Sequence, residues 1–147
     1  MQKILLVGKT GSGKTSLVQS FQGREVVYRK TQAVIFDGVF VDSPGEFLEN
    51  RRLLPALLTS STRCNIVALV QDATGTTSPF SPGFAAMFNK RVIGIVTKID
   101  KESSCPERAE EFLRRAGAKE IIKTSAVEKT GLDGLELAFS REELNDV

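Results

Sequence analysis

Eight consecutive residues near the start of the chain carry the clearest chemical signal in the sequence. They read GKTGSGKT from Gly8 to Thr15 and fit in full the pattern GxxxxGK followed by Ser or Thr. Glycines in such a stretch let the backbone curl so that successive N–H groups point inward at phosphate oxygens. A glycine-rich turn that binds no ligand would look the same. Because the stretch follows an apolar run and opens a predicted helix, we expect a phosphate-binding P-loop, also called Walker A.

The residues of this loop have separate expected roles around a nucleoside triphosphate. The Lys14 ammonium would reach the β- and γ-phosphates, and the Thr15 hydroxyl would ligate Mg²⁺. The pattern ends at Thr15, and we expect no cofactor contact from the next residue, Ser16. Backbone N–H groups along the rest of the loop would surround the phosphates, at Gly8, Gly11, Ser12 and Gly13. The loop therefore predicts a site for a nucleotide and its magnesium ion.

A second polar cluster follows the apolar run Val39–Asp42. A carboxylate at the tip of a strand beside the P-loop is what the coordination sphere of Mg²⁺ needs, so we expect Asp42 to contribute to the metal site. Gly45 would let the backbone approach a γ-phosphate and donate its N–H. Taken alone, this stretch fits a strand followed by a turn equally well.

A third polar cluster ends the apolar run that begins at Val92. The strand delivers Thr97, Lys98 and Asp100 at its carboxyl end, which is the edge where open α/β sheets bind ligands. A charged strand end without a ligand is the alternative interpretation. The three clusters in this order resemble the P-loop GTPase superfamily, and the resemblance covers essentially the whole chain.

The resemblance to P-loop GTPases implies a guanine site. In that superfamily's (N/T)KxD motif the aspartate accepts hydrogen bonds from guanine, which implies this role for Asp100, and the stem of Lys98 would lie along the base. Thr97 replaces the commoner asparagine; this leaves open whether its side chain is tied to the P-loop, and it implies modest guanine affinity. After a later strand, Ser125 and Ala126 of the sequence TSA resemble the loop that backs the base.

Two further residues are candidates for the hydrolytic step. Thr31 resembles the switch I threonine that closes over Mg²⁺ when a γ-phosphate is present, although a threonine that simply opens a strand is the alternative. Many GTPases place a water-orienting glutamine just after the DxxG motif, where this chain has Glu46. A carboxylate there would repel a triphosphate unless it is protonated or turned away. With Lys14, these residues predict slow hydrolysis, roughly 10⁻⁴–10⁻² per second.

Several segments lie outside the generic nucleotide motifs or extend them. They are KTQAV at Lys30–Val34, VDSPGEFLENR at Val41–Arg51 and GIVTKID at Gly94–Asp100. Together with GKTGSGKT they resemble the EutP/PduV family, small proteins of bacterial ethanolamine and propanediol utilisation systems. The resemblance implies an accessory protein whose partners are a microcompartment shell or pathway protein. It leaves the oligomeric state open.

Three functions are compatible with these motifs. The first is a GTP-binding switch or slow GTPase that uses GTP, GDP and Mg²⁺. The second is an ATP-dependent kinase for acetate or propionate, in which Glu46, Arg51 or Arg52 could line the acceptor pocket. The third is a binding module with a structural nucleotide, which would dock through Leu53–Leu58 or Ala73–Pro82. Core packing is the alternative explanation for that leucine cluster.

The composition excludes other kinds of chemistry. The 147 residues include no histidine, so a Ser-His-Asp triad, a Cys-His pair and His-ligated metal are ruled out. The net charge of +2 comes without a basic stripe, so nucleic acid is not an expected partner. The apolar run Ile4–Val7 is too short for a signal peptide or a membrane span. We therefore expect a cytoplasmic protein with no membrane partner, in which Cys64 and Cys105 are reduced.

Alternating strands and helices must position these clusters. Six apolar runs are predicted as strands, at Lys3–Val7, Gln32–Phe36, Val39–Asp42, Asn65–Gln71, Val92–Thr97 and Glu120–Lys123. Helical segments separate most of them, which favours βαβ units and a parallel sheet. Only Asp37-Gly38 separates the second run from the third, which predicts a hairpin and one antiparallel edge strand.

The predicted helices differ in the strength of their signals. Pro106–Ala116 begins with proline, ends before Gly117 and carries an apolar stripe at helical spacing. Other expected helices are Thr15–Phe21, one that begins near Pro55, and Leu132–Phe139, while Ala73–Pro82 is expected to be an exposed loop. The expected fold is a single α/β domain over residues 1–147. The resemblance implies a Ras-like P-loop NTPase with about six mostly parallel strands and helices on both faces.

Overall fold

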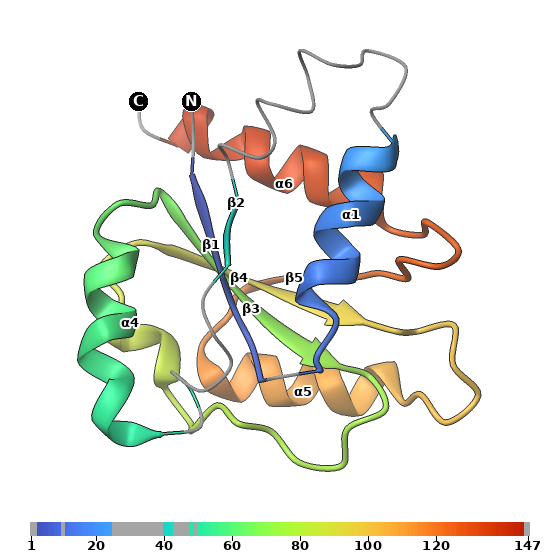
Figure 1. Cartoon of the computed structure of the whole chain (residues 1–147), viewed down its shortest axis with the longest axis horizontal. Coiled ribbons are helices and arrows are strands. Elements are labelled where there is room, and N and C mark those ends of the chain that lie inside the picture. The colour runs from blue at the N-terminus through green and yellow to red at the C-terminus, as the bar shows by residue number, and fades with distance from the viewer. Residues whose placement is uncertain (1–2, 10, 25–39, 43–47, 49, 146–147) are drawn as a thin grey trace.

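The computed structural model describes residues 3–9, 11–24, 40–42, 48 and 50–145, and for residues 22–24, 42 and 139–145 it describes the backbone alone. Figure 1 shows an α/β arrangement in which a central sheet runs between two layers of helices. None of the helices in these ranges has the length and apolar character needed to cross a membrane.

The described sheet contains five strands in the order β2-β1-β3-β4-β5, and every described pair is parallel. The strands are β1 (Ile4–Val7), β2 (Phe40–Asp42), β3 (Ile66–Asp72), β4 (Arg91–Thr97) and β5 (Glu120–Lys123). Five of the six predicted strands are thereby confirmed to within a residue or two at their ends. The sixth, Gln32–Phe36, and the antiparallel hairpin that it would form lie outside the described residues.

The pairing between β3 and β4 is the longest in the described sheet. It runs without a break from Ile66 opposite Arg91 to Asp72 opposite Thr97. The two strands therefore end at the same level, and their carboxyl ends deliver polar residues side by side. This arrangement is the one that open α/β sheets use to build ligand sites.

Helices cover both faces of the sheet, as the alternation of elements predicts (Figure 1). The helices α1 (Lys14–Arg24) and α6 (Leu132–Asn145) cover one face, and α4 (Leu54–Ser61) and α5 (Pro106–Ala116) cover the other. Strand residues alternate between the two layers: Leu6 packs with Leu17 on the first face, and Leu5 packs with Leu57 on the second. Burial on both faces explains why the strands read as continuous apolar runs.

The helix boundaries follow from local sequence signals with two exceptions. Helix α1 spans Lys14–Arg24, which is three residues past the predicted end at Phe21. Helix α5 spans the predicted residues and stops at Gly117, whose φ of 109° favours glycine. Helix α4 has Pro55 in its first turn, where a missing N–H costs nothing. Helix α6 extends to Asn145 rather than ending at Phe139, because the apolar pattern marks the packed part of a helix and not its end.

The segment Ala73–Pro82 has neither helix nor strand, as predicted, and the prediction that it is exposed was wrong only at Ala73 and Phe80. Ala73 is fully buried and Phe80 is 6% exposed. The Phe80 ring packs against Phe84 of the short 3-10 helix η3 (Phe84–Met87), with ring centroids 5.4 Å apart. The prolines and glycine that predicted a surface loop fix its turns, while its two apolar side chains join the core.

Candidate nucleotide-binding site

The glycine-rich loop connects β1 to α1 and has the backbone that its sequence predicts. Gly11 and Gly13 have φ values of 83° and 100°, which other residues rarely adopt. A Cβ on Gly8 would lie 2.7 Å from the Ser12 Oγ and 3.0 Å from the Val70 carbonyl oxygen, so only glycine fits there. Each glycine of the pattern therefore has a conformational or steric reason, which is the close folding of the loop on itself and on β3.

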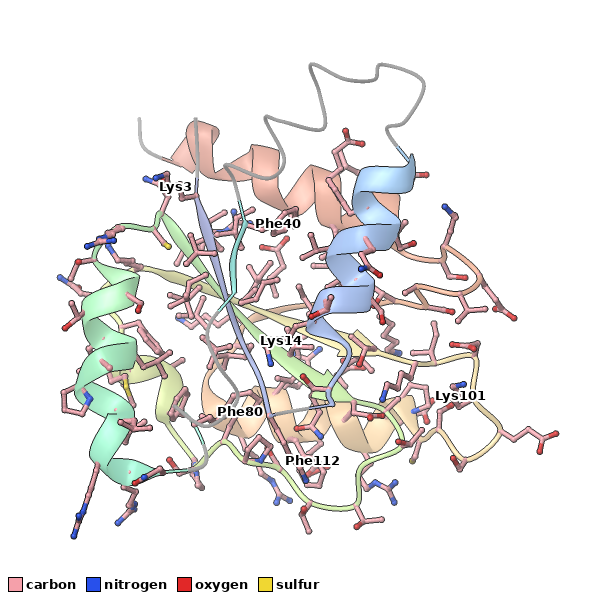
Figure 2. The ribbon with its side chains drawn as sticks, in the orientation of Figure 1. Lys3, Lys14, Phe40, Phe80, Lys101 and Phe112 are labelled. Atoms are coloured by element: carbon pink, nitrogen blue, oxygen red, sulfur yellow. The ribbon has the colours of Figure 1, made fainter. Side chains whose placement is uncertain are left out.

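Lys14 begins α1, and its side chain folds back across the loop (Figure 2). Its Nζ donates to the Gly8 carbonyl oxygen at 2.7 Å and lies 3.4 Å from that of Lys9. The residue is only 7% exposed, so these carbonyls compensate a largely buried cation.

The next two positions of α1 both carry hydroxyl side chains that are exposed to solvent. Thr15 could offer its hydroxyl to a metal ion, as the P-loop pattern predicts. Position 16 is a serine and not a threonine, and Ser16 has no counterpart in the pattern, which ends at Thr15. We therefore assign no cofactor contact to Ser16, and Thr15 stays the metal-ligand candidate of this turn.

Thr97 is tied directly to the loop, which settles the question that its replacement of asparagine left open. Its Oγ1 donates to the Ser12 carbonyl oxygen at 2.6 Å, and the residue is 4% exposed. A Cβ on Gly13 would lie 3.3 Å from the same Oγ1. The shorter threonine therefore reaches the loop because the backbone approaches it closely at a glycine.

Lys98 provides a second connection between β4 and the loop. Its Nζ donates to the Gly11 carbonyl oxygen at 2.8 Å and forms an ion pair with the Asp72 Oδ2 at 2.9 Å. Its φ of 62° is left-handed, an uncommon conformation for a residue with a side chain. This backbone turns the lysine back over the loop directly after the strand ends.

Asp72 is the site residue that sequence reasoning missed. Its Oδ1 accepts from the Thr74 N–H at 2.8 Å and from the Thr74 Oγ1 at 2.6 Å, while Oδ2 faces Lys98. Burial alone would raise the pKa of this carboxyl, but the hydrogen bonds from Thr74 and Lys98 outweigh burial and hold the pKa below its usual value. The available signal was its position at the carboxyl end of β3, next to β4.

The predicted base loop lies beside the strand end that carries Asp100. The Ser125 Oγ donates to the Asp100 Oδ1 at 2.8 Å and accepts from the Glu128 N–H at 3.0 Å. The Ala126 carbonyl oxygen accepts from the Ser20 Oγ of α1 at 2.9 Å. The loop is thus joined both to the (N/T)KxD segment and to the helix that follows the phosphate loop.

The remaining predicted residues are described in part or not at all. Asp42 is the last residue of β2 and pairs with Leu6, but its side chain lies outside the described residues. Thr31, Gly45 and Glu46 also lie outside them. Within the described part of the chain, no three acidic or cysteine side chains gather as metal ligands. Of the predicted metal ligands, the described part includes only the side chain of Thr15, whose exposed hydroxyl is available to Mg²⁺.

A parallel α/β sheet with a tight glycine loop after its first strand, and with neighbouring strand ends bonded to that loop, defines a P-loop-like protein. The chain belongs to the family described as "Ethanolamine utilisation - propanediol utilisation", which matches residues 1–140. The resemblance in the sequence motifs is thereby confirmed.

Several proteins with printed names are similar to this chain over most of its length. This chain is 44% identical over 146 residues to the propanediol utilization protein PduV of Citrobacter freundii, and the match covers 97% of this chain and 96% of that protein. It is 32% identical over 122 residues to the probable acetate kinase EutP of Escherichia coli K12, covering 82% and 77% respectively. A probable acetate kinase EutP of Salmonella typhimurium is also 32% identical, over 124 residues, with 83% and 78% covered.

Proposed function

We propose that the protein binds GTP and GDP with Mg²⁺ at the glycine loop and hydrolyses GTP slowly, as an accessory or switch in ethanolamine or propanediol utilisation. One observation carries the proposal. The Thr97 and Lys98 side chains, which belong to the predicted base motif, hydrogen-bond the carbonyls of Ser12 and Gly11. The phosphate loop and the base motif are therefore held as one unit, as a ligand that spans both requires.

The proposed base contact rests on Asp100. Ser125 donates to its Oδ1, and an ionised carboxylate has lone pairs for several further donors. Guanine presents two donors on one edge, its N1–H and amino group, whereas adenine presents an acceptor at N1. The fixed carboxylate therefore favours guanine over adenine, and this preference is what separates the proposal from ATP-based functions.

Phosphoryl transfer asks the protein for position and charge rather than for covalent chemistry. On binding, the Lys14 ammonium would exchange its carbonyl partners for phosphate oxygens, and the loop N–H groups would hold the rest of the triphosphate. Thr15, Thr31 and Asp42 would hold Mg²⁺, which neutralises charge on the phosphates when bound. Glu46 in place of the usual glutamine predicts poor orientation of the attacking water and hence a slow reaction.

A binding comparison tests the guanine proposal. Fluorescent GTP and ATP analogues are titrated into the protein with and without Mg²⁺, for the native chain, Lys14→Ala and Asp100→Asn. The proposal requires Mg²⁺-dependent GTP binding that Lys14→Ala abolishes, and a guanine preference that Asp100→Asn removes. Glu107→Gln, on the exposed start of α5, is the matched control. A native protein that prefers ATP would overturn the proposal, as would turnover above about one per second without a partner.

A second candidate is an ATP-dependent kinase for a short-chain acid, and the names of the EutP relatives favour it. In that reaction a carboxylate oxygen of acetate forms a bond to the γ-phosphorus as the bond to the β,γ-bridging oxygen breaks, which gives acetyl phosphate and ADP. Arg51 and Arg52, the suggested acceptor residues, lie exposed in the 3-10 helix η2 (Arg51–Leu53). Acetate-dependent release of ADP, with the acyl phosphate trapped by hydroxylamine, would establish this activity.

The third candidate, a nucleotide-stabilised binding module, predicts tight binding with no turnover under any of these conditions. Its suggested docking segment at Leu53–Leu58 is mostly used for packing, because Leu57 is fully buried and Leu54 packs against the same core. Pro55 and Leu58 are exposed, so they are the residues of the segment that a shell or pathway protein could contact.

A further inference from the structure

The edge of the sheet opposite the candidate nucleotide site is lined with basic residues. All described strand pairs are parallel, so the first residues of the strands meet at this edge and their last residues meet at the other. Figure 2 shows the two edges through Lys3, just before β1, and Lys14, near the other end of this strand. The basic residues at or shortly before the start of a described strand, which we call the basic edge, are Lys3, Arg63, Lys90, Arg91 and Lys119. They are scattered along the sequence, and only the parallel sheet brings them to one side.

Most of the positive charge of the basic edge is not neutralised by the residues that the structure describes. Arg91 is the exception, because it forms an ion pair with Glu120, and its Nη1 donates to the Ala138 carbonyl oxygen at 2.6 Å. Within the described part of the chain, no ion pair forms at the other four members, Lys3, Arg63, Lys90 and Lys119. Their charges are therefore available to a partner of opposite charge.

The cations of neighbouring strands lie close enough to act together. The Lys3 N–H donates to the Asn65 Oδ1 at 2.8 Å, which joins the start of β1 to that of β3. Burial raises the pKa of the Cys64 thiol, next to Asn65, and the charges of Lys3 and Lys90 act in the opposite direction. Both ammonium groups therefore lie near the same short segment before β3. A partner that approaches this edge meets their combined field.

A hollow of about 530 Å³ opens within the basic edge, between η3, the start of β4 and the turn from α5 to β5. Lys90 and Lys119 line it together with the ion pair of Arg91 and Glu120. The rest of its wall consists of small or apolar residues, which are Gly83, Ala85, Ala86, Val92 and Gly117. The hollow therefore combines an apolar wall with two lysines that have no described ion-pair partner.

This lining selects the chemistry of its occupant. An apolar group gains free energy by leaving water for a wall of alanine, valine and glycine. Carboxylates complement the charges of Lys90 and Lys119. Single-stranded nucleic acid fits less well, because such strands stack their bases on aromatic side chains and the described lining has none. A protein segment that carries both acidic and apolar side chains matches both features of the hollow.

We propose that the basic edge docks an acidic segment of a partner protein, with one apolar side chain in the hollow and carboxylates against Lys90 and Lys119. The partner and a nucleotide can bind at the same time, because they occupy opposite edges of the sheet. Strand β4 connects the two, since it begins at the hollow with Arg91 and ends at the phosphate loop with Thr97. Attraction between accessible charges speeds association and weakens with added salt.

A peptide titration of the nucleotide-free protein tests this surface independently of the proposed nucleotide function. Three fluorescein-labelled peptides are compared by fluorescence polarisation: glutamates around a central leucine, the same peptide with glycine for leucine, and the first peptide with glutamine for every glutamate. We expect saturable binding of the acidic leucine peptide, with an affinity that falls about tenfold between roughly 50 and 500 mM NaCl. The glycine peptide should bind about fivefold more weakly, and the glutamine peptide should not bind.

Three outcomes would overturn the proposal. The first is an acidic leucine peptide that does not saturate the protein or binds no better than the glycine peptide. The second is tighter binding of single-stranded oligothymidylate than of any peptide, which would assign the edge to nucleic acid. The third is a concentration-dependent dimer in sedimentation that excludes the peptide, which would assign the edge to a second copy of the chain.

A matched pair of lysine substitutions locates the surface. Lys119→Glu reverses an exposed charge at the hollow, and we expect it to weaken binding of the leucine peptide about tenfold. Lys101→Glu makes the same change at an exposed lysine near the opposite edge and should leave the peptide affinity unchanged. Equal peptide affinity in a folded Lys119→Glu protein and the native chain would overturn the assignment.

A third variant tests the hollow itself. Ala86 is exposed and lines the hollow, so the larger ring of Ala86→Phe should fill it. We expect this variant to weaken binding of the leucine peptide while leaving the glycine peptide unaffected. Equal effects on the two peptides would show that no side chain enters the hollow. Should Lys119→Glu not fold, this variant and the comparison of the three peptides still decide.

Discussion

Lys98 and Asp72 form an ion pair between the ends of two neighbouring strands, with the Lys98 Nζ 2.9 Å from the Asp72 Oδ2. The same Nζ donates to the Gly11 carbonyl oxygen at 2.8 Å. One ammonium group therefore joins the ends of β3 and β4 to the phosphate loop. Asp72 does not belong to the proposed nucleotide contacts, so it acts as a positioning residue for Lys98.

Replacing Asp72 by asparagine should weaken nucleotide binding through Lys98. The amide keeps an acceptor for Thr74 but loses the charge that holds the ammonium, so the lysine can leave Gly11. We expect a loss of about three- to tenfold in nucleotide affinity, measured by titration of a fluorescent GTP analogue. Glu107→Gln, which removes an exposed carboxylate outside the loop, should bind as the native chain does. If the nucleotide affinity of Asp72→Asn equals that of the native chain, Asp72 does not position Lys98 for binding.

The stability of the native chain should depend on pH through the same carboxyl. The pKa of Asp72 is lower in the folded chain than its ordinary value. Its charge therefore contributes stability above the ordinary pKa of about 3.9, and this contribution is lost as the pH falls through the folded-state pKa. The difference in urea midpoint between the native chain and Asp72→Asn should shrink between about pH 5 and pH 3. A difference that stays constant or grows over that range would contradict the assignment.

Two substitutions at Thr97 should separate the contribution of its hydroxyl group to stability from that of its side-chain shape. Thr97→Val is nearly isosteric but leaves the buried Ser12 carbonyl without this donor, and we expect a loss of about 1–3 kcal/mol in unfolding free energy. Thr97→Ser keeps the hydroxyl and should retain most of the stability and of the nucleotide affinity. Denaturant unfolding and nucleotide titration of both variants measure the two effects. Equal stability of the valine and serine variants would show that the hydrogen bond contributes nothing.

Gly131, just before α6, should tolerate no side chain. An added Cβ would lie 2.1 Å from the Lys123 carbonyl oxygen, and the φ of 81° is left-handed. Gly83 has a similar φ of 76° with open space around its added Cβ, so it isolates the conformational cost. We expect Gly83→Ala to lose about 1–2 kcal/mol and Gly131→Ala clearly more, as measured by thermal unfolding. Similar losses would mean that the backbone at Gly131 moves aside.

The sequence predicts most of the described fold because its strands and helices carry strong local signals. Helix α5 is an example, since a proline, an apolar stripe and a glycine mark its whole length. The glycine loop is predictable for the same reason, because each of its glycines has either a left-handed backbone or a close neighbour that leaves little room for a side chain. Positions without such signals, such as the buried Phe80 in an otherwise largely accessible loop, are decided by tertiary contacts, here with Phe84.

The candidate site is less predictable where side chains from different strands meet. Asp72 lies in the run ALVQDAT, which matches no nucleotide motif, and only the alignment of β3 with β4 brings it to Lys98. Thr97 does lie in a recognised motif, but it replaces the common asparagine, so the sequence left open whether it bonds the phosphate loop. It does so because the backbone at Gly13 comes close to its side chain. In both cases the contact depends on distances between segments that lie far apart in the sequence.

The unbroken pairing of β3 with β4 fixes the length of both strands. Because side chains alternate between faces, a shift of one residue along either strand would send Asp72 or Thr97 to the wrong side of the sheet. Insertions and deletions are therefore excluded from both strands even where single substitutions are harmless. A length change of one residue anywhere between Ile66 and Asp72 would break the ion pair between Asp72 and Lys98, and so weaken the hold of Lys98 on the phosphate loop, while leaving every predicted nucleotide motif intact in the sequence.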